Sequence, residues 1–120
     1  MTVDQRDVYL CPPTHDDRLE EHLFIVLSVR ESNDYEGTFI GAMITSSEVY
    51  RDDYSFELTD DMFDSPLHKK NSHVRMHLLT LCLKDLVKGK KVNKMKLPYF
   101  KQLMESIGDL IFRYSFKPLP

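Results

Sequence analysis

The sequence predicts a mainly β fold, a small antiparallel barrel with a helix packed against it at the C-terminal end. Several short apolar segments are separated by turn-forming residues over most of the chain. Near the C-terminus, apolar residues instead recur at the spacing of a helix. No internal repeat or long linker divides the 120 residues, which favours a single domain over residues 1–120. Short strands followed by one helix are typical of a small capped barrel.

Two strands are expected before residue 30. The segment DVYLC (7–11) predicts a short strand, and HLFIVLSV (22–29) is a continuous apolar run, typical of a strand buried on both faces. The next segment, RESNDYEG (30–37), predicts a polar turn because Asn, Asp and Gly favour turns.

Three further strands are expected in the middle of the chain, over residues 38–47, 54–58 and 72–83. The first of them contains Gly41 and Ala42, which indicate a bulge or a close backbone approach. A long loop is expected between the second and the third.

A helix is expected over residues 98–113, where Pro98 suits the first turn. Its apolar stripe consists of Phe100, Leu103, Met104, Ile107, Leu110 and Ile111. The lysine-rich segment before it, LKDLVKGKKVNKMK (83–96), predicts an exposed surface segment.

Charge is distributed unevenly along the chain. Residues 1–65 hold 16 of the 19 acidic residues, whereas residues 66–101 hold 10 of the 16 basic ones, and the net charge is -3. Such asymmetry is compatible with one face that attracts polyanions, and equally with lysines that only solvate a surface segment. Charge alone therefore leaves both interpretations open.

Composition also restricts the class of protein. Cys11 and Cys82 lie in strand-like segments outside any CxxC pair, which favours buried, reduced thiols. No apolar run approaches the roughly 18 residues of a membrane helix, and no basic, then apolar leader is seen, so a cytoplasmic protein without membrane contact is expected. The five histidines lack metal-ligand spacing, so no metal and no cofactor are expected.

Polar residues at strand ends and on one strand face are the candidate site residues. His22 stands at the head of the most apolar run, and Thr45, Ser46 and Ser47 end the next strand. His73, Arg75 and His77 alternate with apolar residues and therefore share one strand face. Tyr50 and Tyr54, in a polar loop, are candidates for stacking on bases.

Four segments, in order, resemble the MazF/PemK family of toxin ribonucleases from bacterial toxin–antitoxin systems. QRDVYL is similar to the family's RGDVY strand, and HLFIVLS is similar to RPVLVLS. AMITSS resembles the strand end ITS, and NSHVRMHLLTL resembles DSVVRLDQIRTI. Two positions depart from the family pattern: its Arg-Pro pair is His22-Leu23 here, and the acidic residue that some members carry after Val-Arg is His77.

The resemblance implies a compact SH3-like barrel that forms a homodimer and inhibits growth. It implies metal-independent, sequence-specific cleavage of single-stranded RNA, including messenger RNA, through attack of the 2′-hydroxyl. A cognate antitoxin protein is implied as the second partner.

The resemblance also assigns roles to residues. His22 takes the place of a catalytic arginine and is expected to transfer a proton or hold the phosphate, since imidazole can donate or accept near neutral pH. Thr45 matches an active-site threonine, and Arg75 matches an arginine expected to clamp the phosphate. His77 is a second candidate for proton transfer. RNA binding is expected of Ser46, Ser47, Tyr50, Tyr54 and His73.

Two other functions stay open at this stage. A non-catalytic toxin of the CcdB type would act on DNA gyrase by protein contact, and the loss of the Arg-Pro pair favours this reading. A regulatory member would bind RNA or an antitoxin without cleavage, in a salt-dependent way.

Overall fold

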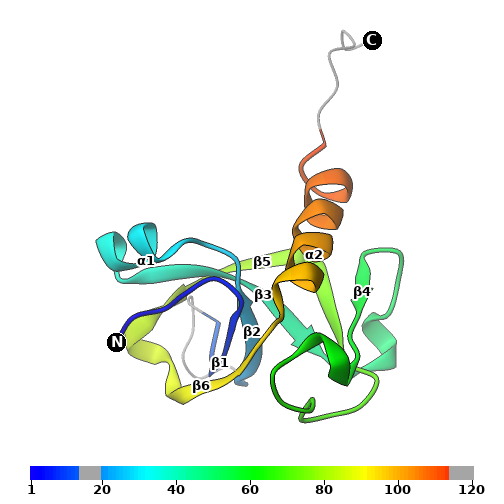
Figure 1. Ribbon diagram of the computed structural model, residues 1–120, viewed down its shortest axis with the longest axis horizontal. Helices are drawn as coiled ribbons and strands as arrows, with labels where there is room; N and C mark the ends of the chain where they lie inside the picture. The colour runs from blue at the N-terminus through cyan, green and yellow to red at the C-terminus, as the bar shows by residue number, and fades with distance from the viewer. Residues whose placement is uncertain (14–19, 114–120) are drawn as a thin grey trace, which may run out of the picture.

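The computed structural model describes residues 1–13 and 20–113, and these form a mainly β fold with a C-terminal helix, as the sequence predicts (Figure 1). One antiparallel sheet has the strand order β4-β5-β3-β2-β1-β6. The strands are β1 (Asp7–Cys11), β2 (His22–Val26), β3 (Thr38–Thr45), β4 (Ser55–Glu57), β5 (His73–Leu83) and β6 (Lys88–Lys94). The helices are α1 (Arg30–Glu36) and α2 (Leu97–Leu110), with 3-10 turns at Glu48–Tyr50, Asp60–Met62 and Lys84–Leu86.

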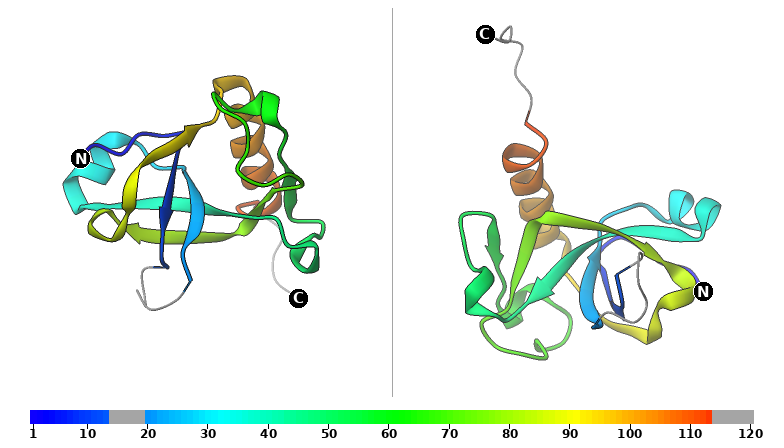
Figure 2. Two further views of the ribbon diagram at one scale, coloured as in Figure 1. Left: turned by 90° about the horizontal axis from the view of Figure 1, so that it is seen from below. Right: turned by 180° about the vertical axis from the view of Figure 1, so that it is seen from behind.

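The sheet curls strongly, but its two edge strands, β4 and β6, do not pair with each other (Figure 2). The segments that follow these strands meet instead. An isolated antiparallel bridge joins Phe63 to Met95, and the Lys96 N–H donates to the Met62 carbonyl at 2.8 Å. The barrel is therefore completed by irregular backbone contacts and not by a continuous ladder.

Apolar side chains pack on both faces of the sheet. Adjacent residues Phe24 and Ile25 are fully buried on opposite sides, in two different clusters. The larger cluster includes Val8, Ile25, Ile44, Val74, Met76, Leu103 and Ile107, and the smaller one includes Val3, Tyr9, Cys11, Phe24, Val26, Phe39 and Cys82. The prediction that this strand is buried on both faces is thus confirmed for Phe24–Val26.

Gly41 has the role expected of a glycine within a strand. A Cβ atom at this position would lie 2.9 Å from Cβ of Phe24, closer than two carbon atoms can pack. Nearby, the β3–β5 register shifts between Ala42 and Ile44. The close approach predicted at Gly41 is therefore present, as a contact with Phe24, and the predicted alternative of a bulge is matched only by a register irregularity two residues on.

The prediction of a polar turn over residues 30–37 is wrong, because residues 30–36 form α1. Asn33 is buried and donates through Nδ2 to the carbonyls of Val3 at 2.8 Å and Ser28 at 3.1 Å. Gly37 ends the helix in the left-handed conformation, with φ of 70°. Residues that favour turns thus anchor and terminate a short helix whose stability comes from tertiary hydrogen bonds.

We expect Asn33→Ala to lower the free energy of unfolding by about 1–3 kcal/mol, because it leaves buried carbonyl groups without donors. Urea denaturation would measure the change. Glu36→Ala, an exposed substitution in the same helix, is the matched control. Equal midpoints for the two variants would show that Asn33 does not anchor α1.

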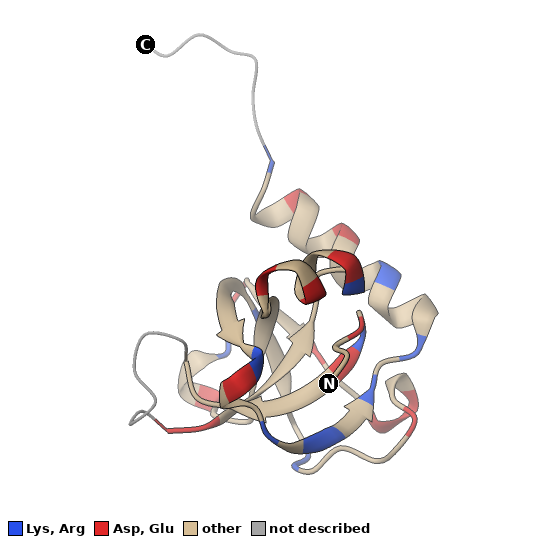
Figure 3. Ribbon diagram, turned by 90° about the vertical axis from the view of Figure 1, so that its left-hand side faces the viewer, with Lys and Arg blue, Asp and Glu red and all other residues tan. Residues whose placement is uncertain are grey.

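The lysine-rich segment is also more ordered than predicted, because residues 88–94 form the edge strand β6. It pairs with β1, and its lysines line this edge of the sheet (Figure 3). Lys94 and Lys91 place Nζ 3.3 and 3.8 Å from Oδ1 of the buried Asp7. An edge strand that is polar on both faces has no apolar alternation, so the sequence gives no strand signal here.

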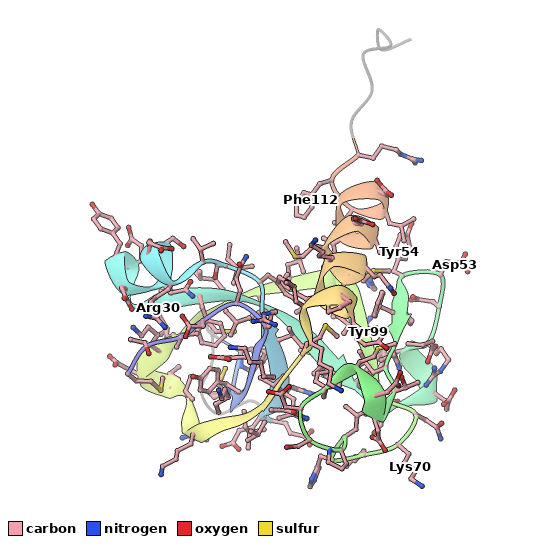
Figure 4. All side chains as sticks on the ribbon, viewed as in Figure 1. Arg30, Asp53, Tyr54, Lys70, Tyr99 and Phe112 are labelled. Carbon is pink, nitrogen blue, oxygen red and sulfur yellow. The ribbon has the colours of Figure 1, made fainter. Side chains whose placement is uncertain are left out.

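Helix α2 covers residues 97–110, close to the predicted 98–113, and extends away from the sheet (Figure 1). Only part of its apolar stripe is buried. Phe100, Leu103 and Ile107 belong to the larger core cluster, whereas Met104 and Leu110 are exposed. Phe112, just beyond the helix, also lies away from the sheet (Figure 4).

The two cysteines are buried side by side in the smaller cluster, as free thiols. The interaction between the two thiols raises the pKa of Cys82, as does its burial, and lowers the pKa of Cys11. The Cys82 thiol donates to the Thr80 carbonyl at 3.6 Å. Burial was expected for both residues. Their contact with each other was not expected, because Cys11 and Cys82 are far apart in the sequence. The fold brings β1 and β5 together around the smaller cluster.

Candidate functional site

A pocket of about 840 Å³ opens where the start of β2, the end of β3 and strand β6 approach two loops. It collects five of the nine predicted site residues from separate parts of the chain. These are His22, Thr45, Ser46, Ser47 and Tyr50. The remaining walls come from β1, β6 and the loop between β4 and β5, and include Val8, Leu10, Phe63, Leu67, Val92 and Asn93.

His22 is the first residue of β2 and is partly buried. Its register partner on β1 is Cys11, so pairing of the two strands fixes its backbone at the pocket wall. Glu20 and Glu21 line the same wall. The pocket therefore contains an imidazole beside two carboxylates.

Three hydroxyl groups follow one another at the end of β3. Thr45 is the last residue of the strand, and its Oγ1 accepts a hydrogen bond from the Ser47 N–H at 3.1 Å. This local turn holds Ser46 and Ser47 at the pocket wall. Hydroxyl groups of this kind can bind phosphate oxygens or orient a ribose hydroxyl.

Arg75 does not line the pocket. Its guanidinium carbon lies 4.4 Å from the centroid of the Tyr50 ring, and Tyr50 does line the pocket. This geometry is a cation–π contact. The aromatic ring thus separates the predicted phosphate clamp from the space in which His22 and Thr45 lie.

His77 and Tyr54 form a second aromatic contact beside Arg75. Their ring centroids lie 5.2 Å apart at an interplanar angle of 56°, and His77 Nε2 lies 3.5 Å from a terminal nitrogen of Arg75. Neither residue lines the pocket. The candidates therefore fall into two neighbouring groups. The first lines the pocket and includes Tyr50, and the second, around Arg75, contains His77 and Tyr54. The contact between Tyr50 and Arg75 joins the two groups.

His73 shares its strand face with Arg75 and His77, while Val74 and Met76 point into the core, so the predicted alternation is confirmed. However, the His73 side chain has no exposed surface. Among residues 1–13 and 20–113, neither of its ring nitrogens finds a hydrogen-bond partner, and the same is true of the buried Nε of Arg75. The sequence predicted that His73 binds RNA. Because its ring lies below the surface, RNA cannot contact it directly in this arrangement.

The sequence did not indicate that Arg51 contributes to the site. Its guanidinium binds Glu48 at 3.0 Å, the Asn71 carbonyl at 2.6 Å, and Glu57. Hydrogen bonds to Glu57 and Glu48 raise the pKa of Arg51, which keeps it charged. These bonds fasten the loop that carries Tyr50 to β4 and to the loop before β5. Only the three-residue spacing of Glu48 and Arg51 was visible in the sequence.

His68 and Lys69 also line the pocket, although their sequence context indicates only an exposed loop. Across residues 1–13 and 20–113, no group of three or more His, Cys, Asp or Glu side chains is placed to hold a metal ion. The pocket thus combines imidazole, hydroxyl and ammonium groups, which suits proton transfer and anion binding.

A family profile described as PemK-like, MazF-like toxin of type II toxin-antitoxin system matches residues 4–111. The chain belongs to this family. No curated protein matches the sequence significantly. The relationship to the PemK/MazF-like toxins therefore rests on the profile and on the fold.

Solved structures of such toxins share the fold at low sequence identity. The MazE-MazF structure (Form-II) of Deinococcus radiodurans superposes with a TM-score of 0.68 and 13% identity, over 92% of this chain and 96% of that chain. An endoribonuclease in complex with its cognate antitoxin from a mycobacterial species gives a TM-score of 0.67 and 12% identity, over 99% and 98%. MazF (Form-I) of Deinococcus radiodurans gives a TM-score of 0.66 and 16% identity, over 94% of this chain and 99% of that chain.

The described part of this PemK/MazF-like toxin has no helix long and apolar enough to cross a membrane.

Proposed function

We propose that this toxin is a metal-independent, sequence-specific endoribonuclease that cleaves single-stranded RNA. The observation that carries the proposal is the pocket, which brings His22, Thr45 and two neighbouring serines together with the aromatic ring of Tyr50. Metal-free cleavage needs a base that accepts the proton of the 2′-hydroxyl and an acid that protonates the leaving 5′-oxygen. It also needs hydrogen-bond donors or cations that stabilise the charge developing on the phosphate oxygens. The ribose 2′-hydroxyl restricts this chemistry to RNA.

In the proposed reaction, His22 transfers a proton and Thr45 orients the ribose or a phosphate oxygen. Tyr50 offers a ring on which a base can stack. Arg75 is the proposed phosphate clamp, and a rotation of Tyr50 away from its guanidinium would connect it to the pocket. Its buried Nε has no hydrogen-bond partner within the described part of the chain, which supports a role in binding an anion.

We also propose that an antitoxin binds this chain, as the comparison with a toxin in complex with its cognate antitoxin suggests. A homodimer is proposed as well. The apolar residues Met104, Leu110 and Phe112 are exposed on and just beyond α2, and a second copy of the chain would cover them. Light scattering during gel filtration would measure the mass in solution.

A non-catalytic toxin is the alternative, and one observation favours it. Arg75, the candidate with permanent charge, is stacked on Tyr50 outside the pocket, and His22 stands where the family carries an arginine. A toxin of this second kind would act by binding a protein such as DNA gyrase, or by holding RNA without cleaving it.

The decisive experiment incubates the purified protein, free of antitoxin, with a long single-stranded RNA in EDTA. We expect discrete fragments that end in cyclic phosphate, because the 2′-hydroxyl attack needs no metal. The double variant His22→Ala, Arg75→Ala, prepared in the same way, controls for contaminating ribonuclease. Intact RNA beside a well-folded wild-type protein, with inhibition of gyrase, would replace the proposal with the non-catalytic alternative.

A further inference from the structure

We propose that His68 is the second proton-transfer residue of this pocket and that Lys69 is a second cation, in addition to Arg75, that holds the scissile phosphate. The proposal rests on the ribonuclease function proposed above. His68 and Lys69 line the same pocket as His22, but they come from the loop between β4 and β5. The sequence offers no motif for them, and only the fold brings them to the pocket.

The loop is held in place on both sides of His68. On one side, the Leu67 N–H donates to Asp60 Oδ1 at 2.8 Å, and the Leu67 side chain packs against the larger core cluster. On the other side, Ser72 Oγ donates to the Lys69 carbonyl at 2.7 Å. A histidine between two anchored residues is restricted to a small region at the pocket wall, as proton transfer requires.

Charge decides where in the pocket an RNA phosphate binds. Glu20 and Glu21 line the pocket beside His22, and their carboxylates repel a phosphate. Lys69 lines it from the other loop, and among the described residues no carboxylate forms an ion pair with Lys69. The phosphate is therefore drawn toward His68 and Lys69.

The two imidazoles supply both proton transfers of the reaction. The neutral imidazole accepts the proton of the 2′-hydroxyl while its oxygen forms a bond to phosphorus. The bond from phosphorus to the 5′-oxygen breaks, and the protonated imidazole gives its proton to that oxygen. The products are a 2′,3′-cyclic phosphate and a 5′-hydroxyl, and Lys69 stabilises the charge on the phosphorus oxygens.

His77 is less well placed for the second role. Its ring packs on Tyr54 and it does not line the pocket. His68, in contrast, faces the same space as the other titratable groups of the pocket, which are Glu20, Glu21, His22, Tyr50 and Lys69. The geometry therefore assigns to His68 the role that the resemblance alone gave to His77.

The test compares His68→Ala, His68→Gln and Lys69→Ala with Lys70→Ala in a cleavage assay from pH 5 to 9. Lys70 is the matched control because it is exposed, points away from the body of the protein and does not line the pocket (Figure 4). We expect both His68 variants to lower kcat by about 100- to 10,000-fold and to lose one limb of a bell-shaped pH profile. Added imidazole should restore part of the rate of His68→Ala, and Lys69→Ala should raise KM and also lower kcat.

The outcomes separate this inference from the function on which it rests. If the wild type cleaves RNA and both His68 variants, folded by circular dichroism, keep its rate and both limbs of its profile, the assignment of His68 is wrong while the ribonuclease function stands. If Lys69→Ala behaves like Lys70→Ala, Lys69 does not hold the phosphate. If the wild type does not cleave RNA at all, the proposed function fails first and the inference fails with it.

Discussion

His22→Ala is expected to slow RNA cleavage by about 100- to 10,000-fold, the usual contribution of a positioned acid or base. The residue begins β2 at the pocket wall and its side chain is only partly buried, so its loss should leave the core intact. Single-turnover cleavage of a short RNA would measure the rate, and circular dichroism would confirm the fold.

His22→Arg separates proton transfer from charge. Arginine stays protonated, so it can bind a phosphate but cannot exchange a proton at neutral pH. We expect this variant to keep a KM near that of the wild type while kcat falls as far as in His22→Ala. A His22→Arg variant that cleaves at the wild-type rate would show that His22 supplies only positive charge.

Phe24→Ala is expected to lower the free energy of unfolding by about 3–5 kcal/mol, through lost burial and the cavity left behind. Phe24 is fully buried in the smaller core cluster, and Gly41 on the neighbouring strand leaves the space in which it fits. Such a loss is a large part of the roughly 5–15 kcal/mol that stabilises a typical domain.

Urea denaturation of Phe24→Ala beside Phe112→Ala would measure this effect. Phe112 is 63% exposed near the end of α2, so its substitution by alanine should change stability little. A midpoint for Phe24→Ala that matches the control would mean that the smaller cluster contributes little to the fold.

Apolar patterning was sufficient to predict the central strands and α2. The strands β2, β3 and β5 carry residues buried on at least one face, so their periodicity is strong. It failed for α1, which is held by one buried asparagine, and for β6, an edge strand of lysines. In both cases tertiary contacts, which leave little trace in a local pattern, stabilise the element.

The candidate site, too, was predicted only where local pattern determines the position of a residue. Residues at strand ends, such as His22 and Thr45, could be placed because pairing of β2 and β3 brings those ends together. The sequence could not show that Tyr50 would lie on Arg75, or that His73 would be completely buried. Those outcomes depend on how the loop after β3 folds over β5, and Arg51 fixes that loop through distant partners.

The pairing of β1 with β6 has a consequence for biosynthesis. Asp7 lies opposite Lys94 in the register, and the same two strands supply Val8, Leu10, Val92 and Asn93 to the pocket wall. Contacts between such distant parts of a chain form late and raise contact order, which slows folding. A nascent chain that has not reached β6 lacks one wall of the pocket, so the proposed nuclease site is incomplete until the ribosome has synthesised that strand.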